Sequence, residues 1–355
     1  MTPERSAIDE LRAAIRSLPK AELHLHLEGS IRPATVVELA ARHGVALAEE
    51  EARERYRYAD FAGFLAAFMW VVSFVREPAD YALITRRLAE ELLAEGVVYA
   101  EVITAVGVML WQRQDAEANL AAMAEAARAF EPRGLVIRWL PDAAWQLGDR
   151  AALEVARRVV RWTDLGVVGF GMGGDEMRFG YERFRPAFEL AAEHGLHRTA
   201  HAGETGPPAK IRDAVEMLGA ERIGHGIAAI HDPAVADLLV ERGVALEVCP
   251  TSNVCTGALA SQLGRGAATL ADHPLGRLLA AGIPVTLSTD DPAMFHTDLL
   301  GEYAACAAPL GLPSAAILRL LEASFEHAFL PPAAKRAYVQ RLRADSAARG
   351  LRQEA

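Results

Sequence analysis

The sequence predicts an α/β fold in which eight parallel strands close into a (β/α)8 TIM barrel. Short apolar segments alternate with longer segments rich in Ala, Leu, Glu and Arg that have helical spacing. Several helical segments end at a glycine directly before the next strand, as at Gly96, Gly195, Gly243 and Gly282. The length of 355 residues suits one such barrel with insertions.

Each predicted strand is a short apolar run bounded by turn residues. The eight strands are expected at residues 21–25, 97–103, 136–140, 167–170, 197–202, 222–224, 245–248 and 285–288. The clearest helices between them are expected at residues 80–95, 116–130, 151–162, 184–194 and 233–242. Strands that each precede a helix imply a parallel sheet.

Two regions exceed a minimal barrel. Residues 33–95 hold extra helices between the first two strands, and the chain from Ser314 onward reads as two further helices and a frayed end. We therefore expect a single domain over residues 1–355, with its barrel core at 19–330 and extra helices after strand one and at the C-terminus.

Composition narrows the range of partners. The net charge is −10 and no run of Lys or Arg is present, which argues against nucleic-acid binding. The first twenty residues lack the apolar core of a signal peptide, and no apolar stretch is long enough to span a bilayer. Three cysteines without a CxxC motif favour reduced thiols. We expect a cytoplasmic protein with a small-molecule partner, and the sequence predicts no oligomeric state.

Five residues at predicted strand ends indicate a metal site. They are His24, His26, His201, His225 and Asp290. His24 and His26 are two apart, so both point to one side of a strand. A barrel places its chemistry at the C-terminal ends of its strands. Histidines combined with a carboxylate suit a catalytic Zn²⁺, although Fe²⁺, Co²⁺ or Mn²⁺ would accept the same ligands.

The lysines favour one metal ion over two. Barrel hydrolases with two metals often bridge them with a modified lysine at the end of strand four. This chain has only Lys20, Lys210 and Lys335, and strand four ends in FGMGGDE without a lysine. We therefore expect one Zn²⁺ per chain.

Further polar residues near the strand ends suit proton transfer. Glu204 follows strand five, and a partly desolvated carboxyl there would act as an acid. His225 could bind the metal or could instead contact the attacking water. Asp290 and Asp291 are adjacent, so on an extended chain they would face opposite sides and divide metal and substrate contacts between them. The glycines at 171, 173 and 174 would let backbone N–H groups approach a flat ligand.

Six separate motifs resemble those of the adenosine deaminase family. They are PKAELHLHLEGS (19–30), GGDE (173–176), HAGE (201–204), RIGHG (222–226), CPTSN (249–253) and STDDP (288–292). The resemblance implies that His24, His26, His201 and Asp290 bind one Zn²⁺, whose bound water attacks C6 of a 6-aminopurine. It also implies that ammonia leaves and a 6-oxopurine remains.

The resemblance implies a role for four other residues. Glu204 would protonate N1 of the purine, and His225 would orient and deprotonate the water. Asp291 would hydrogen-bond N7, and the backbone N–H of Gly174 would meet N3. The catalytic residues are thus expected to be Glu204, His225 and Asp291.

The substrate is expected to be adenosine or deoxyadenosine, converted to inosine or deoxyinosine. Two alternatives within the family are aminodeoxyfutalosine, whose nucleoside carries a carboxyphenyl tail, and adenine. Glu28 stands where animal members carry an Asp that contacts ribose, so the sugar preference stays open. The run DDPAMFHT (290–297) lacks the glycine that adenine deaminases tend to have after the phenylalanine, and is closer to nucleoside deaminases.

The substrate's outer part would meet the segment after strand one. Phe61, Phe64, Phe68 and Trp70 form either a lid over the barrel mouth or an ordinary helix packed on the barrel. Arg178 or Arg76 could contact an acidic extension of the substrate. We therefore expect Gly174, Glu28, Asp291, Phe61 and Arg178 to bind substrate.

Two readings compete with deamination. Ester or lactone hydrolysis by a related barrel enzyme usually needs a second metal, which the missing lysine disfavours. A catalytically silent purine-binding protein would have lost at least one catalytic residue, yet Glu204, His225 and Asp291 are all present.

Overall fold

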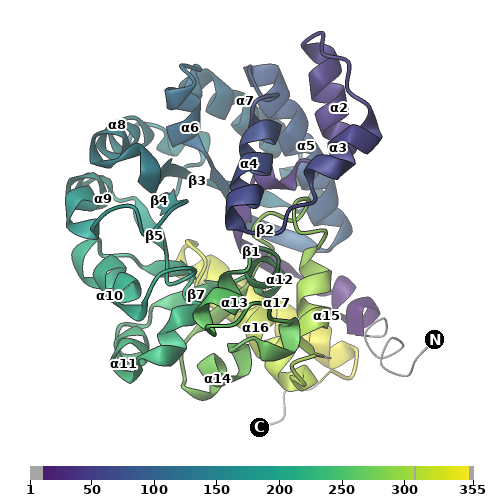
Figure 1. Cartoon of the computed structure of the whole chain (residues 1–355). Helices are drawn as coiled ribbons and strands as arrows, with labels where there is room; N and C mark the ends of the chain where they lie inside the picture. Colours follow the sequence, from purple (N-terminus) through teal and green to yellow (C-terminus); the bar gives the residue numbers. More distant parts are fainter. Residues whose placement is uncertain (1–10, 308, 352–355) are drawn as a thin grey trace.

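The computed structural model describes residues 11–307 and 309–351 and contains an eight-stranded parallel barrel (Figure 1). The strands are β1 (Lys20–His26), β2 (Val97–Thr104), β3 (Val136–Ala144), β4 (Gly169–Gly173), β5 (His197–Ala202), β6 (Arg222–His225), β7 (Ala245–Val248) and β8 (Val285–Leu287). Each strand pairs with the next along the chain. The predicted fold class is therefore confirmed.

The barrel closes just beyond β8. The His26 N–H donates to the Asp290 carbonyl at 2.8 Å, and the Asp290 N–H donates to the His24 carbonyl at 3.0 Å. Leu25 and Asp290 form an isolated parallel bridge. The backbone that closes the barrel is thus the backbone of three residues predicted to bind a metal.

Strand four differs most from its predicted bounds. It was expected at 167–170, whereas β4 begins at Gly169 and ends at Gly173. Val167 forms only an isolated bridge to Trp139 and lies before the continuous ladder. The apolar run predicted the strand correctly, but the glycines that continue it carry no apolar signal. As a result Gly174 directly follows the strand, at the edge of the barrel mouth.

Helices follow the strands and cover the outside of the barrel. Those that begin after β2 to β7 are α6 (Val106–Trp111), α7 (Ala116–Arg128), α8 (Asp149–Val159), α9 (Arg185–Glu193), α10 (Pro208–Met217), α11 (Pro233–Arg242), α12 (Pro250–Cys255), α13 (Ala258–Gln262) and α14 (Leu275–Ala280). The predicted glycine stops are present. Gly96 and Gly243 adopt φ of +79° and +63°, a region that glycine enters without steric cost.

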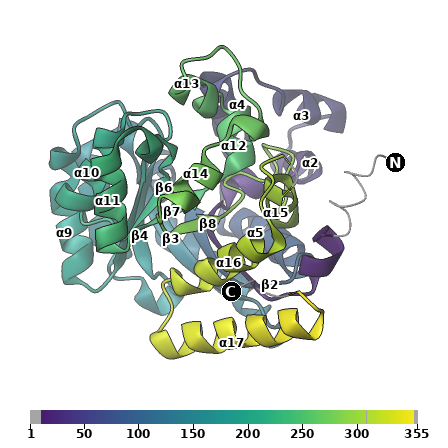
Figure 2. The same ribbon diagram turned by 90° about the horizontal axis from the view of Figure 1, so that it is seen from below.

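The extra helices lie where the sequence placed them. Between β1 and β2 are α2 (Pro33–Arg42), α3 (Glu49–Arg55), α4 (Phe61–Val72) and α5 (Pro78–Ala94), and after β8 are α15 (Leu299–Ala307), α16 (Ser314–Glu326) and α17 (Pro332–Ala348). Figure 2 shows α16 and α17 at one end of the barrel and α4, α12 and α13 at the other. The predicted frayed end includes residues 352–355, which lie outside the described residues.

Helix α4 carries a continuous apolar run, FAGFLAAFMWVV. Among the described residues, no helix is long and apolar enough to cross a membrane.

Candidate active site

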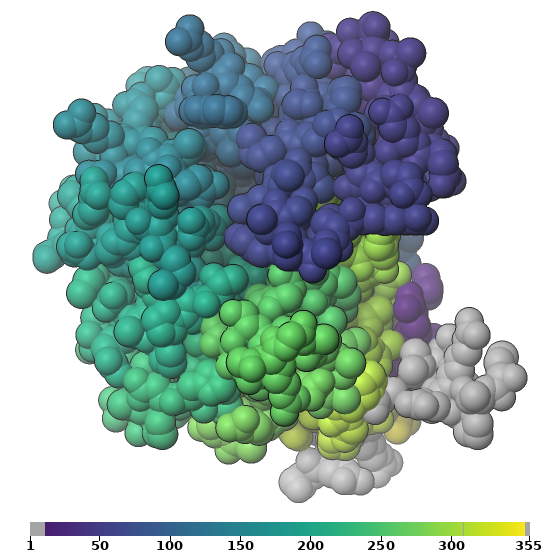
Figure 3. Space-filling view, viewed as in Figure 1, coloured from purple at the N-terminus to yellow at the C-terminus, as the bar shows by residue number. Residues whose placement is uncertain are grey.

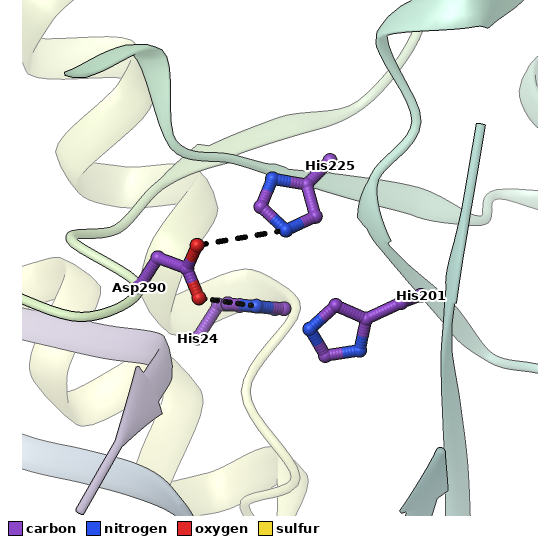
Figure 4. A group of neighbouring side chains, drawn as sticks. All are labelled: His24, His201, His225 and Asp290. Carbon is purple, nitrogen blue, oxygen red and sulfur yellow. Dashed lines mark ion pairs between the residues drawn. The ribbon is translucent and has the colours of Figure 1, made fainter. Parts of the chain in front are cut away.

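Four predicted site residues form one cluster at the C-terminal end of the barrel. His24, His201, His225 and Asp290 each offer a ligand atom, and these atoms lie within 4.8 Å of one another (Figure 4). His26 joins the same cluster, because its Nε2 is 3.3 Å from His201 Nε2 and 3.3 Å from Asp290 Oδ1. The tertiary structure therefore brings all five residues together from β1, β5, β6 and the end of β8.

Two members of the cluster adopt a left-handed backbone. The φ angles of His225 and Asp290 are +60° and +66°. Such conformations are uncommon for residues other than glycine and concentrate at functional sites. The sequence argument treated Asp290 and Asp291 as extended chain, and the structure corrects it. The turn at Asp290 brings both carboxylates to the same cavity instead of to opposite sides.

Glycine provides the space that the rings occupy. A Cβ atom at Gly224 would lie 2.7 Å from His24 Cε1, closer than such contacts occur. A Cβ atom at Gly29 would lie 1.7 Å from Asp291 Oδ1. The RIGHG and LEGS segments therefore need glycine because side chains of the cluster pass directly over the backbone.

Hydrogen bonds behind the cluster fix the imidazole rings. His24 Nδ1 lies 2.8 Å from Glu247 Oε2, and His201 Nδ1 lies 3.0 Å from the Met172 carbonyl oxygen. Because both partners accept, each ring in its neutral, metal-binding form carries its proton on Nδ1 and directs an unprotonated Nε2 into the cluster. These outer partners were not identified from the sequence, since nothing in the chain marks Glu247 as a neighbour of His24.

The donor set fits a single Zn²⁺-type ion. His24 Nε2 is buried and has no hydrogen-bond partner among the described residues. Unprotonated imidazole nitrogens that converge with a carboxylate oxygen are the ligands of a catalytic zinc centre. Ser252 Oγ donates to Asp290 Oδ2 at 2.7 Å and so orients that carboxylate.

Glu204 is buried beside the cluster. Its Oε2 lies 3.7 Å from His225 Nε2. Burial, and then the nearby Asp290 carboxylate, raise the pKa of Glu204 well above its ordinary value. A carboxyl group in this position holds its proton to higher pH than an ordinary glutamate and is suited to donate it.

Glu176 holds the loop that carries Glu204. Its carboxylate accepts hydrogen bonds from the backbone N–H groups of Gly203, Thr205 and Gly206, at 2.6, 2.6 and 2.8 Å. The sequence analysis noted the GGDE motif but gave this glutamate no role. The only available signal was that an acidic residue followed a glycine-rich strand end.

Asp291 faces the cavity next to the cluster. Its Oδ1 is buried and has no hydrogen-bond partner among the described residues. Burial, and then Asp290, raise its pKa well above the ordinary value. A protonated Asp291 could donate a hydrogen bond to an acceptor on a bound ligand.

A cavity of about 860 Å³, open solvent at its mouth included, extends outward from the cluster. Polar groups lie at its inner end, including Glu204, Asp291 and Gly174. The outer wall is apolar and is formed by Phe61, Phe64, Leu65, Phe68, Met69 and Val108. The inner and outer parts thus offer different chemistry.

Helix α4 supplies most of the outer wall. Phe61, Phe64 and Phe68 line the cavity, as a lid would, whereas Trp70 does not. The Trp70 ring packs on Phe74, with centroids 5.1 Å apart. In Figure 3 the dark blue surface of α4 meets the green surface of α12 and α13 on the face seen in Figure 1.

Two predicted substrate contacts lie away from the cavity wall. Glu28 is buried at the base of α4 and accepts a hydrogen bond from the Ala105 N–H at 3.1 Å, but it does not line the cavity. Arg178 is exposed and its guanidinium lies 5.8 Å from the Phe179 ring. Arg76 donates from Nε to the Ser73 carbonyl at 2.9 Å. Neither arginine lines the cavity.

Two polar side chains that were not predicted to contact substrate also line the cavity. Asp142 lies near the C-terminal end of β3, at the mouth of the barrel. Burial, and then the nearby Glu28 carboxylate, raise the pKa of Asp142 well above its ordinary value. Gln146 follows β3 and accepts a hydrogen bond from the Asp175 N–H at 3.2 Å. Their position could have been read from the end of strand three, had the predicted strand extended beyond residue 140.

Known proteins match nearly the whole chain. The sequence model of the adenosine deaminase family matches residues 19–345. Aminodeoxyfutalosine deaminase of Streptomyces coelicolor is 39% identical over 327 residues, covering 90% of this chain and 82% of that protein. Adenine deaminase of Agrobacterium fabrum is 34% identical, covering 92% and 98%. The crystal structure of adenine deaminase from Arthrobacter aurescens has a TM-score of 0.85 and 31% identity, covering 92% and 98%.

Proposed function

Because this chain belongs to the adenosine deaminase family, and is therefore a deaminase that acts on a C–N bond, we propose that it hydrolytically removes the 6-amino group of aminodeoxyfutalosine. The cavity carries the proposal: a polar inner end is followed by an apolar outer wall. The inner end suits an aminopurine, and the outer wall suits an aromatic tail. This substrate was an alternative in the sequence analysis, where adenosine and deoxyadenosine came first.

The metal would be held by His24, His26, His201 and Asp290. When bound, a Zn²⁺ ion would lower the pKa of a coordinated water toward neutrality and so supply a nucleophile. Glu247 and the Met172 carbonyl would keep the His24 and His201 rings oriented for this role. His225, which lies in the same cluster but outside this set of four ligands, would orient the attacking water.

The purine would be bound by its ring nitrogens. Glu204, whose raised pKa keeps it protonated, would donate to N1 and make C6 more electrophilic. Asp291, also protonated, would donate to N7. The backbone N–H of Gly174 at the end of β4 would meet N3. These contacts are common to every 6-aminopurine and do not by themselves choose among substrates.

Substrate choice would depend on the outer wall. Adenosine and adenine would leave the rings of Phe61, Phe64 and Phe68 in water, whereas a carboxyphenyl tail would cover them. Covering apolar surface stabilises a complex by about 25 cal/mol per Å². Adenine is the second candidate, because the Agrobacterium and Arthrobacter proteins named for it are also similar to this chain.

A substrate panel tests the proposal. The ratio kcat/KM would be measured with zinc-loaded protein on aminodeoxyfutalosine, adenosine, deoxyadenosine and adenine, following the loss of the 6-amino group by absorbance. We expect the highest value on aminodeoxyfutalosine. A higher value on adenine would support the second candidate and refute the first, and no turnover of any compound would refute both.

A matched pair of variants tests the role of the wall. Phe68→Ala removes a ring that lines the cavity, and Trp70→Ala removes a ring of the same helix that faces away. One aromatic contact is worth about 1.5 kcal/mol, or about tenfold in binding. We expect Phe68→Ala to lower kcat/KM about tenfold on aminodeoxyfutalosine and little on adenine, and Trp70→Ala to spare both.

Arg178 stays a prediction with its own test. A carboxylate on the tail would need a positive partner near the mouth, and Arg178 lies in the exposed segment after β4. Arg178→Ala should then lower activity on aminodeoxyfutalosine relative to adenosine. Equal activity ratios for the variant and the wild-type protein would remove Arg178 from the site.

A further inference from the structure

A chain of three buried hydrogen bonds leads from the backbone of α14 to His225. The Leu275 N–H donates to His273 Nδ1 at 3.1 Å. His273 Nε2 lies 3.2 Å from Asn253 Oδ1, and Asn253 Nδ2 lies 3.0 Å from His225 Nδ1. Asn253 is 0% exposed, His225 1% and His273 5%, so water does not compete with these bonds.

The backbone N–H sets the direction of the whole chain. A peptide nitrogen can only donate, so His273 Nδ1 must accept and the neutral ring carries its proton on Nε2. Burial lowers the pKa of His273 to about 3, which keeps the ring neutral. His273 Nε2–H then donates to Asn253 Oδ1, and this fixes the orientation of the amide.

The orientation of Asn253 decides the tautomer of His225. With its oxygen toward His273, the amide presents its NH₂ group to His225 Nδ1, which must accept. The proton of the neutral His225 ring is therefore on Nε2. That nitrogen faces the site, 3.8 Å from Asp290 Oδ2 and 3.7 Å from Glu204 Oε2.

We propose that Asn253 and His273 are positioning residues that hold His225 as the Nε2–H tautomer, so that His225 donates a hydrogen bond into the active site. This inference rests on the proposed function for its catalytic meaning. In this tautomer His225 Nε2 has no free lone pair, so it neither ligates a metal nor accepts a proton from the attacking water. The role of His225 becomes orientation of the water by donation, instead of deprotonation.

The inference also separates two possible sets of metal ligands. By distance alone, His225 groups with His24, His201 and Asp290, whereas His26 contacts His201 and Asp290. His24 and His201 carry their protons on Nδ1 and direct lone pairs at the site, whereas His225 has the opposite arrangement. His26 therefore completes the ligand set.

Nitrogen NMR of the histidine rings measures the tautomer directly. Protonated and unprotonated ring nitrogens have well-separated ¹⁵N shifts. The protein would be labelled on histidine and studied with and without zinc, and the His225 signals would be assigned from their loss in His225→Gln. We expect a protonated Nε2 and an unprotonated Nδ1 at His225. A protonated Nδ1 in the wild-type protein would overturn the proposal.

Asn253→Asp reverses the last hydrogen bond with little change in shape. A carboxylate can only accept, so the His225 ring should move its proton to Nδ1. We expect kcat to fall about 10- to 100-fold, as for other partners of catalytic groups, with KM less affected. If His225 keeps its Nε2 proton in this variant, Asn253 does not set the tautomer.

His273 offers a conservative control. His273→Gln places an amide nitrogen near the position of Nε2 and can still donate to Asn253 Oδ1, whereas His273→Leu cannot. The first variant should keep the wild-type tautomer and most of kcat, and the second should lose both. Equal losses in the two variants would indicate a packing role and refute the proposal.

The NMR readout needs no substrate. A wild-type His225 with the expected tautomer, in a protein that turns over none of the tested purines, would refute the proposed substrates but not the hydrogen-bond chain. The opposite tautomer in an active deaminase would refute the chain alone.

Discussion

At the N-terminal end of the barrel a buried cation is paired with two buried carboxylates, whereas at the C-terminal end several buried polar atoms have no hydrogen-bond partner among the described residues. Arg222, at the start of β6, forms ion pairs with Glu101 and, at 2.5 Å from its Nε, with Glu247. It also donates to the His327 carbonyl at 2.9 Å and stacks on the Phe329 ring. The segment after α16 thus helps to close this end.

The opposite end shows the reverse pattern. Six buried side-chain atoms lack a hydrogen-bond partner among the described residues, and three of them, His24 Nε2, Glu28 Oε2 and Asp291 Oδ1, belong to ionisable groups near the mouth. Buried polar groups are normally satisfied, so exceptions of this kind mark places where a ligand completes the bonding. The same strands therefore carry stabilising ion pairs at one end and the candidate reactive groups at the other.

Glu247 connects the two ends. One of its oxygens accepts from Arg222 and the other from His24 Nδ1. The ion pair therefore also orients a predicted metal ligand. Burial by itself would raise the pKa of Glu247, but the nearby Arg222 and His24 outweigh burial, so the pKa is lowered from its ordinary value. We expect substitutions at the C-terminal end to lower mainly activity, and substitutions at the N-terminal end to lower mainly stability.

The largest expected effect is loss of a metal ligand at the C-terminal end. His201→Ala should abolish tight zinc binding and lower activity by more than about 100-fold. That is the largest loss expected when only a hydrogen-bond partner of a metal ligand is changed. Zinc content would be measured by elemental analysis and activity by ammonia release. Treatment of the wild-type protein with a chelator, followed by zinc, should abolish and restore turnover. Full activity of the metal-free protein would contradict the assignment.

Glu204→Gln should give the next largest effect. Loss of a general acid lowers kcat by about 10²- to 10⁴-fold, while zinc content and melting temperature should stay near wild type. Because the pKa of Glu204 is raised, its acid form persists to higher pH than that of an ordinary glutamate and is lost as pH rises through that pKa. Wild-type kcat/KM should therefore fall on the alkaline side, and an unchanged profile up to high pH would rule out this acid.

At the N-terminal end the expected effect is on stability. Arg222→Met leaves the Glu101 and Glu247 carboxylates buried without their cation, which should cost about 3–5 kcal/mol of unfolding free energy. Denaturant unfolding measures this change. Adding Glu101→Gln to the variant should recover part of it, and additive losses in the double variant would contradict a shared ion-pair network.

The smallest expected effect concerns Glu95, between α5 and β2. Burial, and then Asp298, raise its pKa from 4.5 to about 7. The folded state then binds more protons than the unfolded state between these values, so this group lowers stability as pH rises from 4.5 to 7. Glu95→Gln should remove that part of the pH dependence of the melting temperature and leave activity near wild type. Parallel melting curves against pH would show that Glu95 does not titrate in this range.

Much of the fold could be predicted because the signals are local. Apolar runs marked all eight strands, four of them directly after a glycine stop, and the strand ends marked the residues that the barrel brings together. The clustering of these residues followed from that alone, since parallel strands of a barrel direct their C-terminal residues to one mouth. The β4 boundary was wrong because Gly171 and Gly173 extend the strand without an apolar signal.

The barrel, the cluster of His24, His26, His201, His225 and Asp290, and membership of the family could all be predicted from the amino-acid sequence. Which atoms face one another became known from the three-dimensional structure. It placed Glu247 behind His24, Glu176 under the Glu204 loop and Asn253 behind His225, and it set Glu28 and Arg178 away from the cavity wall. The physical reason is that hydrogen-bond partners from distant segments leave no pattern in a single chain, whereas strand periodicity does.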